Sequence, residues 1–179
     1  MPSQTEKIFL IDTDKCDGCR ECVKACARRH FGVEHPGYAR IRIEEFQEAK
    51  LCVPVLCQAC EDSPCIKTCP MNTRIKLDNG SIVTDEERCI GCRTCVYICP
   101  TGAPVENPLT GKLMTCDRCG DDNETPLCVR ACEKQKALQF IKPHDIGRKT
   151  ARGCATRMKK AYKPPAAIKA NTHPQEHEL

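Results

Sequence analysis

Sixteen of the eighteen cysteines in this chain of 179 residues fall into four groups of four, and this pattern constrains the fold more than any other feature. Every group opens with a C-x2-C pair and closes with a C-x3-C pair. The first and third groups have the tight spacing C-x2-C-x2-C-x3-C, the second has C-x2-C-x4-C-x3-C, and the fourth has C-x2-C-x8-C-x3-C. In chain order, these quartets are Cys16, Cys19, Cys22 and Cys26; Cys57, Cys60, Cys65 and Cys69; Cys89, Cys92, Cys95 and Cys99; and Cys116, Cys119, Cys128 and Cys132.

The tight spacing predicts cubane [4Fe–4S] clusters. Three thiolates from one curled loop can occupy three corners of a cube, whereas the fourth cysteine lies past the loop on a helical turn and points elsewhere. Gly18 and Gly91 lie inside C-x2-C turns, where a residue without Cβ tolerates a left-handed backbone. Pro70 and Pro100 follow the last cysteine of the second and third quartets, where a proline stops the helix. Four quartets therefore predict four clusters.

Zinc and disulfides are the alternative uses of so many cysteines. A structural zinc ion takes four ligands from two separated pairs, so repeated C-x2-C-x2-C triplets are poor zinc geometry. Disulfides belong to oxidising compartments, and residues 1–9 are polar and contain no apolar signal-peptide core. We therefore expect a cytoplasmic iron–sulfur protein, with a zinc-stabilised interaction module as the rival hypothesis.

The aromatic content is low, with no Trp, four Phe and three Tyr. Such a composition builds a weak hydrophobic core, and small cysteine-rich domains commonly use bound metal in its place. We therefore expect the iron-free chain to be largely unfolded.

Charge is distributed unevenly along the chain. Residues 1–132 hold 17 Lys+Arg against 20 Asp+Glu, a net charge of −3, whereas residues 133–179 hold 11 against 4, a net charge of +7. With about +2 on each oxidised core and −1 on each thiolate, four clusters would add about −8. An acidic cluster-bearing body is thus expected to carry a basic tail.

Short strands and helices are expected to alternate with the quartets. Tyr38–Phe46 alternates apolar and charged side chains, which indicates a half-buried strand. The Asp78-Asn79-Gly80 turn between Ile75–Leu77 and Ile82–Val83 indicates a hairpin. Further strands are expected at Lys7–Asp12, Leu113–Thr115 and Ala137–Ile141. Short helices are expected at Arg20–His30, Ser63–Cys69, Arg93–Cys99 and Pro126–Cys132.

The quartet order, the Cys99-Pro100-Thr101-Gly102-Ala103 segment and the loosened second and fourth quartets resemble the four-cluster polyferredoxin family over about residues 5–142. That family supplies electron-transfer subunits of molybdenum and tungsten enzymes, formate dehydrogenases, hydrogenase complexes and carbon monoxide dehydrogenase partners. The resemblance implies an α+β fold of two ferredoxin-like lobes, a double bacterial-ferredoxin fold. The body would span 1–142, with a middle lobe at about 52–103 and an outer lobe from 5–51 and 104–142. A basic C-terminal tail would span 143–179.

The resemblance also implies how the quartets share clusters. The second and third quartets would exchange their last cysteines, and the first and fourth would do the same. Pro follows Cys69 and Cys99, whereas Ala27 and Glu133 follow the last cysteines of the outer quartets, which agrees with this division. Spacing alone leaves open the simpler pairing in which each quartet holds its own cluster. The implied ligand sets are Cys57, Cys60, Cys65 and Cys99; Cys89, Cys92, Cys95 and Cys69; Cys16, Cys19, Cys22 and Cys132; and Cys116, Cys119, Cys128 and Cys26.

The function implied by the resemblance is the relay of single electrons without a substrate site. The sequence contains no G-x-G-x-x-G, no G-x-x-x-x-G-K-[ST] and no nucleophile elbow, so no catalytic residue is assigned. The expected partner is a catalytic oxidoreductase subunit of anaerobic metabolism, preferably a tungsten or molybdenum aldehyde or formate oxidoreductase. A flavin- or NAD-linked redox subunit is a further candidate partner. The alternative is a free soluble polyferredoxin carrier.

Several residues outside the ligand sets have expected roles. Asp17, Ile90 and Arg118 lie between ligands and are candidate tuners of cluster potential. Cys52 and Cys154 lie outside the quartets, and we expect them to be small buried hydrophobes.

The tail is expected to contain a helix over Asp145–Tyr162, from the spacing of Ile146, Ala151, Ala155, Met158 and Tyr162. Two roles are open: a helix packed over its own acidic body, or a docking arm that grips a catalytic subunit or a second copy. No aromatic interleaving or strong apolar face supports binding to nucleic acid or lipid. No segment reaches the ~18–20 apolar residues of a membrane span.

Overall fold

The computed structural model describes residues 7–120, 125–143 and 145–146. The chain divides into a compact body, Met1–Pro143, and a second unit, His144–Leu179. Most of the helix expected at Asp145–Tyr162, together with Cys154, lies outside the described residues. Among the described residues, no helix is long and apolar enough to cross a bilayer.

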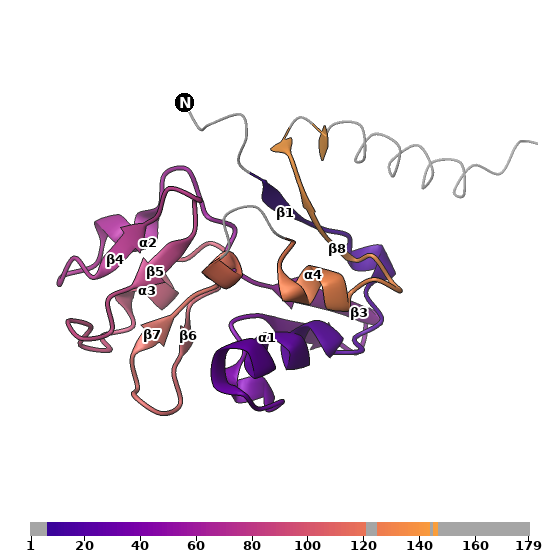
Figure 1. Cartoon of the computed structure of the whole chain (residues 1–179), viewed down its shortest axis with the longest axis horizontal. Coiled ribbons are helices and arrows are strands. Elements are labelled where there is room, and N and C mark those ends of the chain that lie inside the picture. Colours follow the sequence, from indigo (N-terminus) through magenta and orange to yellow (C-terminus); the bar gives the residue numbers. More distant parts are fainter. Residues whose placement is uncertain (1–6, 121–124, 144, 147–179) are drawn as a thin grey trace, which may run out of the picture. The chain divides into compact units, whose positions relative to one another are not determined.

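The strands of the body form four separate antiparallel pairs rather than one sheet (Figure 1). β1 (Ile8–Ile11) pairs with β8 (Leu138–Ile141), which brings the two ends of the body together. The other pairs join strands that are neighbours in the chain. They are β2 (Arg42–Phe46) with β3 (Leu51–Val55), β4 (Arg74–Lys76) with β5 (Ile82–Thr84), and β6 (Val105–Glu106) with β7 (Leu113–Met114).

The four α-helices of the described body each carry or adjoin cysteines of one quartet. They are α1 (Glu21–Phe31), α2 (Pro64–Lys67), α3 (Thr94–Tyr97) and α4 (Leu127–Ala131). α1 ends at Gly32, whose left-handed backbone (φ +70°) directs its N–H to the carbonyl oxygen of Arg28 at 3.0 Å. α2 and α3 end shortly before Pro70 and Pro100, as expected from the inability of proline to continue a helix.

The strands and helices expected between residues 7 and 141 are present, with small shifts at their ends, and two strands were missed. β2 begins at Arg42 rather than at Tyr38 because Pro36–Tyr38 forms a 3-10 turn. β3 was missed because Pro54 interrupts its pattern, although it pairs with β2 over five residues, with Pro54 opposite Ile43. β6, with only two residues, is too short to leave a periodic signal. The mixture of short helices and separately paired strands is of the α+β class.

Buried apolar side chains gather in two clusters that contain many of the thiols. The larger cluster includes Ala27, Ile41, Leu56 and Leu138, none more than 2% exposed. The smaller cluster is centred on Ile82, which is 1% exposed. Cysteines complete both clusters: Cys22, Cys26, Cys128 and Cys132 in the first, and Cys57, Cys65, Cys89 and Cys95 in the second. The thiols are thus part of the core rather than an addition to its surface.

Candidate metal centres

Three hollows in the body are each lined by four cysteines. Each set of four combines three cysteines of one quartet with the last cysteine of another. The hollows measure about 290, 310 and 320 Å³, including the space at their mouths. We name them the Cys16 set (Cys16, Cys19, Cys22 and Cys132), the Cys57 set (Cys57, Cys60, Cys65 and Cys99) and the Cys89 set (Cys69, Cys89, Cys92 and Cys95).

The four remaining quartet cysteines also lie together, where α1 packs against α4. Burial raises the pKa of Cys128 well above its usual value, and the neighbouring thiolates of Cys116, Cys26 and Cys119 raise it further. Burial likewise raises the pKa of Cys116, with a contribution from Cys26. We name these four residues the Cys116 set (Cys26, Cys116, Cys119 and Cys128).

The last cysteine of every quartet accepts a hydrogen bond from a backbone N–H further along the chain. The sulfur–nitrogen distance is 3.3 Å in one pair and 3.4 Å in the other three. Such bonds aim the sulfur and stabilise its negative charge. The pairs are Cys26 with Arg40, Cys69 with Thr73, Cys99 with Ala103, and Cys132 with Leu138.

Hydroxyl groups add to this stabilisation near the Cys89 set. The Thr94 hydroxyl lies 3.4 Å from Cys92 Sγ and is the largest cause of the lowered pKa of that thiol. Burial acts to raise the pKa of Cys69, but the Thr73 hydroxyl at 3.2 Å and several backbone N–H groups outweigh burial and lower it. Both thiols are therefore prepared for the thiolate state that metal ligation requires.

The C-x2-C turns use the left-handed backbone expected from their glycines. Gly18 and Gly91 have φ values of +75° and +68°. At the same position of the second and fourth quartets, Ala59 (φ +51°) and Arg118 (φ +59°) take this conformation despite carrying a Cβ. The loop shape is thus common to all four quartets, although only the first and third have a glycine at this position to predict it.

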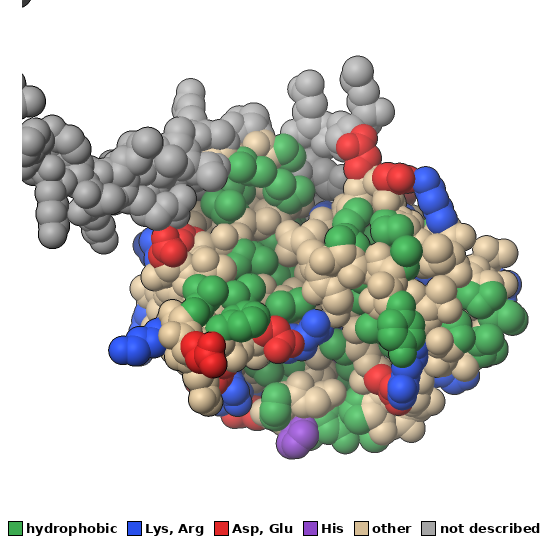
Figure 2. Space-filling view, turned by 180° about the vertical axis from the view of Figure 1, so that it is seen from behind, with side chains coloured by type: hydrophobic (Ala, Val, Ile, Leu, Met, Phe, Trp, Pro, Cys, Tyr) green, Lys and Arg blue, Asp and Glu red, His purple; other side chains and the backbone are tan. Residues whose placement is uncertain are grey.

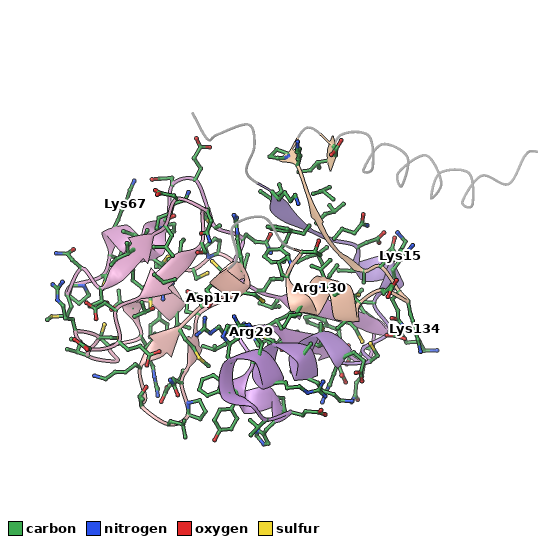
Figure 3. The ribbon with its side chains drawn as sticks, viewed as in Figure 1. Lys15, Arg29, Lys67, Asp117, Arg130 and Lys134 are labelled. Carbon is green, nitrogen blue, oxygen red and sulfur yellow. The ribbon has the colours of Figure 1, made fainter. Side chains whose placement is uncertain are left out.

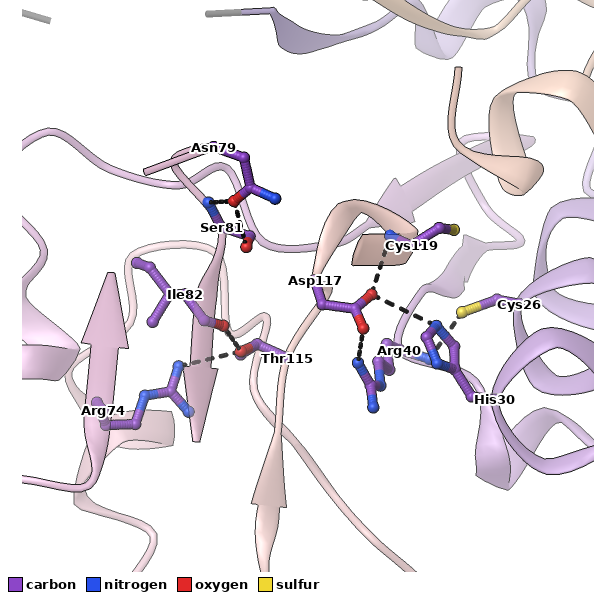
Figure 4. Close-up of polar contacts among 10 residues, drawn as sticks. All are labelled: Cys26, His30, Arg40, Arg74, Asn79, Ser81, Ile82, Thr115, Asp117 and Cys119. Atoms are coloured by element: carbon purple, nitrogen blue, oxygen red, sulfur yellow. Dashed lines mark hydrogen bonds and ion pairs between the residues drawn. The ribbon is translucent and has the colours of Figure 1, made fainter. Parts of the chain in front are cut away.

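Three half-buried titratable side chains, His30, Arg40 and Asp117, lie close to the Cys116 set (Figure 4). Arg40 Nη1 lies 2.6 Å from Asp117 Oδ2, and His30 Nε2 lies 3.5 Å from Asp117 Oδ1. Burial and the positive charge of Arg40 lower the pKa of His30, and Asp117 only partly opposes them. Asp117 is half-buried, whereas Lys15 and Lys67 are exposed and point outward (Figure 3).

The candidate tuners lie beside the cysteine sets. Asp17 Oδ1 accepts the backbone N–H of Cys19 at 3.1 Å, and Ile90, 61% exposed, lines the hollow of the Cys89 set. Arg118 is 6% exposed, and its guanidinium carbon lies 5.7 Å from the centroid of the Phe140 ring. Their effect on potential stays a prediction.

Other residues of the sites were missed in the sequence. Thr73, Arg40 and Arg74 contact cysteine sulfur, and the only signal for Thr73 is its place four residues after Cys69. Cys52 is partly buried in β3, where its sulfur lies against Gly18, so it packs behind the first cluster loop.

The donors around each hollow fit a cluster with a positively charged core. Burial and the neighbouring thiolates Cys132, Cys19 and Cys16 raise the pKa of Cys22 to about 12. Thiols packed together in this way deprotonate only when positive charge replaces their protons, as metal binding does. Four sulfur ligands around one volume are the donor set of a [4Fe–4S] cluster. Fold and sites together define an iron–sulfur protein that transfers electrons.

Comparison with known proteins gives the family. Residues 49–142 match the family described as 4Fe-4S dicluster domain, and residues 8–33 match a 4Fe-4S binding domain. The chain belongs to this 4Fe-4S family of electron-transfer proteins, binds [4Fe–4S] clusters, and is an electron-transfer subunit rather than a catalytic one.

Two named relatives and one solved structure illustrate the similarity. The chain is 37% identical over 140 residues to the polyferredoxin-like subunit of aliphatic sulfonate oxidoreductase from Pyrococcus furiosus, covering 76% of this chain and 79% of the relative. It is 35% identical over 153 residues to a subunit of anaerobic dimethyl sulfoxide reductase from Escherichia coli, covering 76% of this chain and 73% of the relative. Among solved structures, a chain of the active site complex BamBC of benzoyl coenzyme A reductase with 1,5-dienoyl-CoA matches at 26% identity and a TM-score of 0.45. The match covers 75% of this chain and 74% of that chain.

Proposed function

We propose that the chain holds four [4Fe–4S] clusters, one in each cysteine set, and relays single electrons along them. The observation that carries this proposal is that each hollow is lined by three cysteines of one quartet and the last cysteine of another. This exchange suits two ferredoxin-like lobes, a middle lobe at about 52–103 and an outer lobe from 5–51 and 104–142. The clusters supply the one-electron chemistry. The chain fixes their spacing, limits access of water and donates N–H···S hydrogen bonds.

Electrostatic interactions between thiols of different sets support a single row of clusters. In three pairs, a thiolate of one set raises the pKa of a cysteine in the next, in addition to burial, which is the largest cause in each case. These pairs are Cys22 with Cys128, Cys57 with Cys116, and Cys65 with Cys95. The order of the row is therefore the Cys16, Cys116, Cys57 and Cys89 sets.

Both ends of this row have an exposed ligand. Among the described cysteines, only Cys19 in the Cys16 set and Cys92 in the Cys89 set are exposed. Exposed apolar side chains, Ile90 and Met71, also line the hollow of the Cys89 set. Hydrophobic side chains of this kind recur over the surface in Figure 2. An electron can thus enter at one end and leave at the other.

The proposed partner at one end is a tungsten or molybdenum oxidoreductase subunit in the cytoplasm. Among the partners implied by the family resemblance, an aldehyde or formate enzyme was preferred. The names of the relatives, a sulfonate oxidoreductase and a sulfoxide reductase, favour an oxidised sulfur substrate instead. The opposite end would exchange electrons with a flavin- or NAD-linked subunit or with a second copy of the chain.

Single Cys→Ser variants of the holoprotein test the exchanged ligands. In this arrangement, Cys69→Ser and Cys92→Ser alter the same cluster, so both should change the same electron paramagnetic resonance signal and the same midpoint potential. Cys60→Ser should change a different one. If Cys69→Ser instead alters the cluster that Cys60→Ser alters, each quartet holds its own cluster and the exchange is wrong.

Anaerobic purification of the full chain from its native cells tests the partner. We expect a larger polypeptide to comigrate, and the reduced complex should pass electrons to these clusters. A chain that purifies alone would instead be a free carrier. Removing residues 144–179 tests whether the tail is a docking arm or a helix packed over its own body. A docking arm predicts that the partner is lost from the complex while the body keeps its iron. Unchanged assembly would contradict the arm.

A further inference from the structure

Arg74 is a buried cation between the Cys57 and Cys89 sets. It begins β4, is 4% exposed, and lines the hollows of both sets. Its Nη1 lies 3.9 Å from Cys95 Sγ, and its Nη2 lies 3.8 Å from Cys65 Sγ. Each end of the guanidinium fork therefore faces a different ligand set.

The other polar groups around Arg74 are neutral. Nη1 donates to the Thr84 hydroxyl at 3.1 Å. Nη2 donates to the Thr115 hydroxyl at 3.4 Å (Figure 4). Within the described part of the chain, no carboxylate forms an ion pair with Arg74, and its buried Nε has no hydrogen-bond partner. The two hydroxyls hold the fork in place but do not balance its charge.

A guanidinium stays protonated in proteins, so Arg74 cannot avoid this cost by losing a proton. A buried charge without a counter-charge is strongly unfavourable. Arg40, whose backbone N–H donates to Cys26 Sγ, meets this requirement through Asp117. For Arg74, the negative charge closest at hand is that of the Cys65 and Cys95 thiolates, whose sulfur atoms lie 3.8 and 3.9 Å from its guanidinium nitrogens.

We propose, building on the four-cluster function above, that Arg74 is a positioning residue that raises the reduction potentials of the Cys57 and Cys89 clusters together. Each cluster with its thiolates is an anion and gains one more negative charge on reduction, so a nearby cation favours the reduced state. Because one guanidinium faces both sets, it shifts both potentials in the same direction. The difference between the two potentials, which sets the energy change of electron transfer between these clusters, is therefore little altered.

Redox titration of the anaerobic holoprotein, followed by electron paramagnetic resonance, tests this role. Arg74→Gln should lower two of the four midpoint potentials and leave the other two unchanged. At a fixed potential we expect the ratio of reduced to oxidised cluster to fall about tenfold at both sites, which equals ~59 mV for a one-electron couple. Arg74→Lys keeps the charge, so in this variant the ratio of reduced to oxidised cluster should fall by less. Lys50→Gln is the control, since it removes one positive charge from an exposed side chain between β2 and β3 that lines neither hollow.

The outcomes separate this role from the four-cluster proposal. Wild-type protein without [4Fe–4S] signals would overturn the four-cluster function itself. Normal wild-type signals with unchanged potentials in an iron-replete Arg74→Gln variant would overturn only the role of Arg74. If Arg74→Gln loses iron while Arg74→Lys retains it, the charge is needed to hold the clusters, which supports the proposal. Equal loss in both variants would contradict it, because the geometry of the fork and not its charge would then matter.

Discussion

Replacing Gly18 by alanine adds one methyl group at a place where the body has no room for it. Gly18 has φ +75°, and a Cβ there would lie 2.8 Å from Cys52 Sγ, closer than real Cβ contacts. The left-handed backbone costs an L-residue about 1–2 kcal/mol. Overpacking costs about 1–3 kcal/mol more. The sum is about 2–5 kcal/mol, which corresponds to a fall of about 6–15 °C in the unfolding temperature at ~3 °C per kcal/mol.

Two further variants separate these contributions. Gly32 has a similar φ of +70°, and nothing lies within 4 Å of the place that a Cβ would take, so Gly32→Ala carries only the backbone cost. We expect Gly32→Ala to lower the unfolding temperature by about 3–6 °C. In the double variant Gly18→Ala/Cys52→Ala, the sulfur is gone and the packing cost should largely disappear. The unfolding temperature of the double variant should therefore be close to that of Gly32→Ala.

The assay is anaerobic thermal bleaching of the visible cluster absorbance at one fixed scan rate, because loss of clusters makes unfolding irreversible. The proposed packing of Cys52 against the first cluster loop requires that Gly18→Ala bleach at a lower temperature than Gly32→Ala. It also requires that Cys52→Ala restore most of the difference. Equal bleaching of the two single variants, with no rescue, would refute it.

Three other predictions concern the thiols and their loops. Thr73→Val removes the hydroxyl 3.2 Å from Cys69 Sγ, so redox titration should show a lower potential for the Cys89-set cluster alone, with Thr73→Ser as control; an unchanged potential would contradict this. Ala59→Gly relieves a left-handed residue (φ +51°) and should raise the bleaching temperature by about 3 °C, for about 1 kcal/mol; a lower temperature would show that the Cβ is needed. Chelation of iron should abolish native far-ultraviolet circular dichroism, because cysteines form much of both buried clusters; a cooperative melt of the iron-free chain would be the opposite result.

The cysteine loops could be predicted because their chemistry is local. Ligand spacing fixes the loop, and a glycine such as Gly91 or a proline such as Pro100 marks its turn and its end within a few residues. The strands around the Asp78-Asn79-Gly80 turn were also visible, since both the turn and the alternation lie within ten residues.

Features that depend on distant parts of the chain were not visible in the same way. Spacing alone did not decide which cysteines share a hollow. Cys132 reaches the first quartet only because α4 packs against α1 and β8 pairs with β1. Nothing in the local sequence marks Arg74 as buried, because it binds Thr115, 41 residues further on. A basic residue at the start of a strand carries no local sign that two thiol sets will surround it.

Iron and acid-labile sulfide per polypeptide, measured on anaerobically prepared holoprotein, test the four-cluster proposal most directly. Four [4Fe–4S] clusters predict about sixteen iron atoms and about sixteen sulfides, with paramagnetic signals on reduction. Far fewer iron atoms without such signals, or zinc in their place, would contradict it.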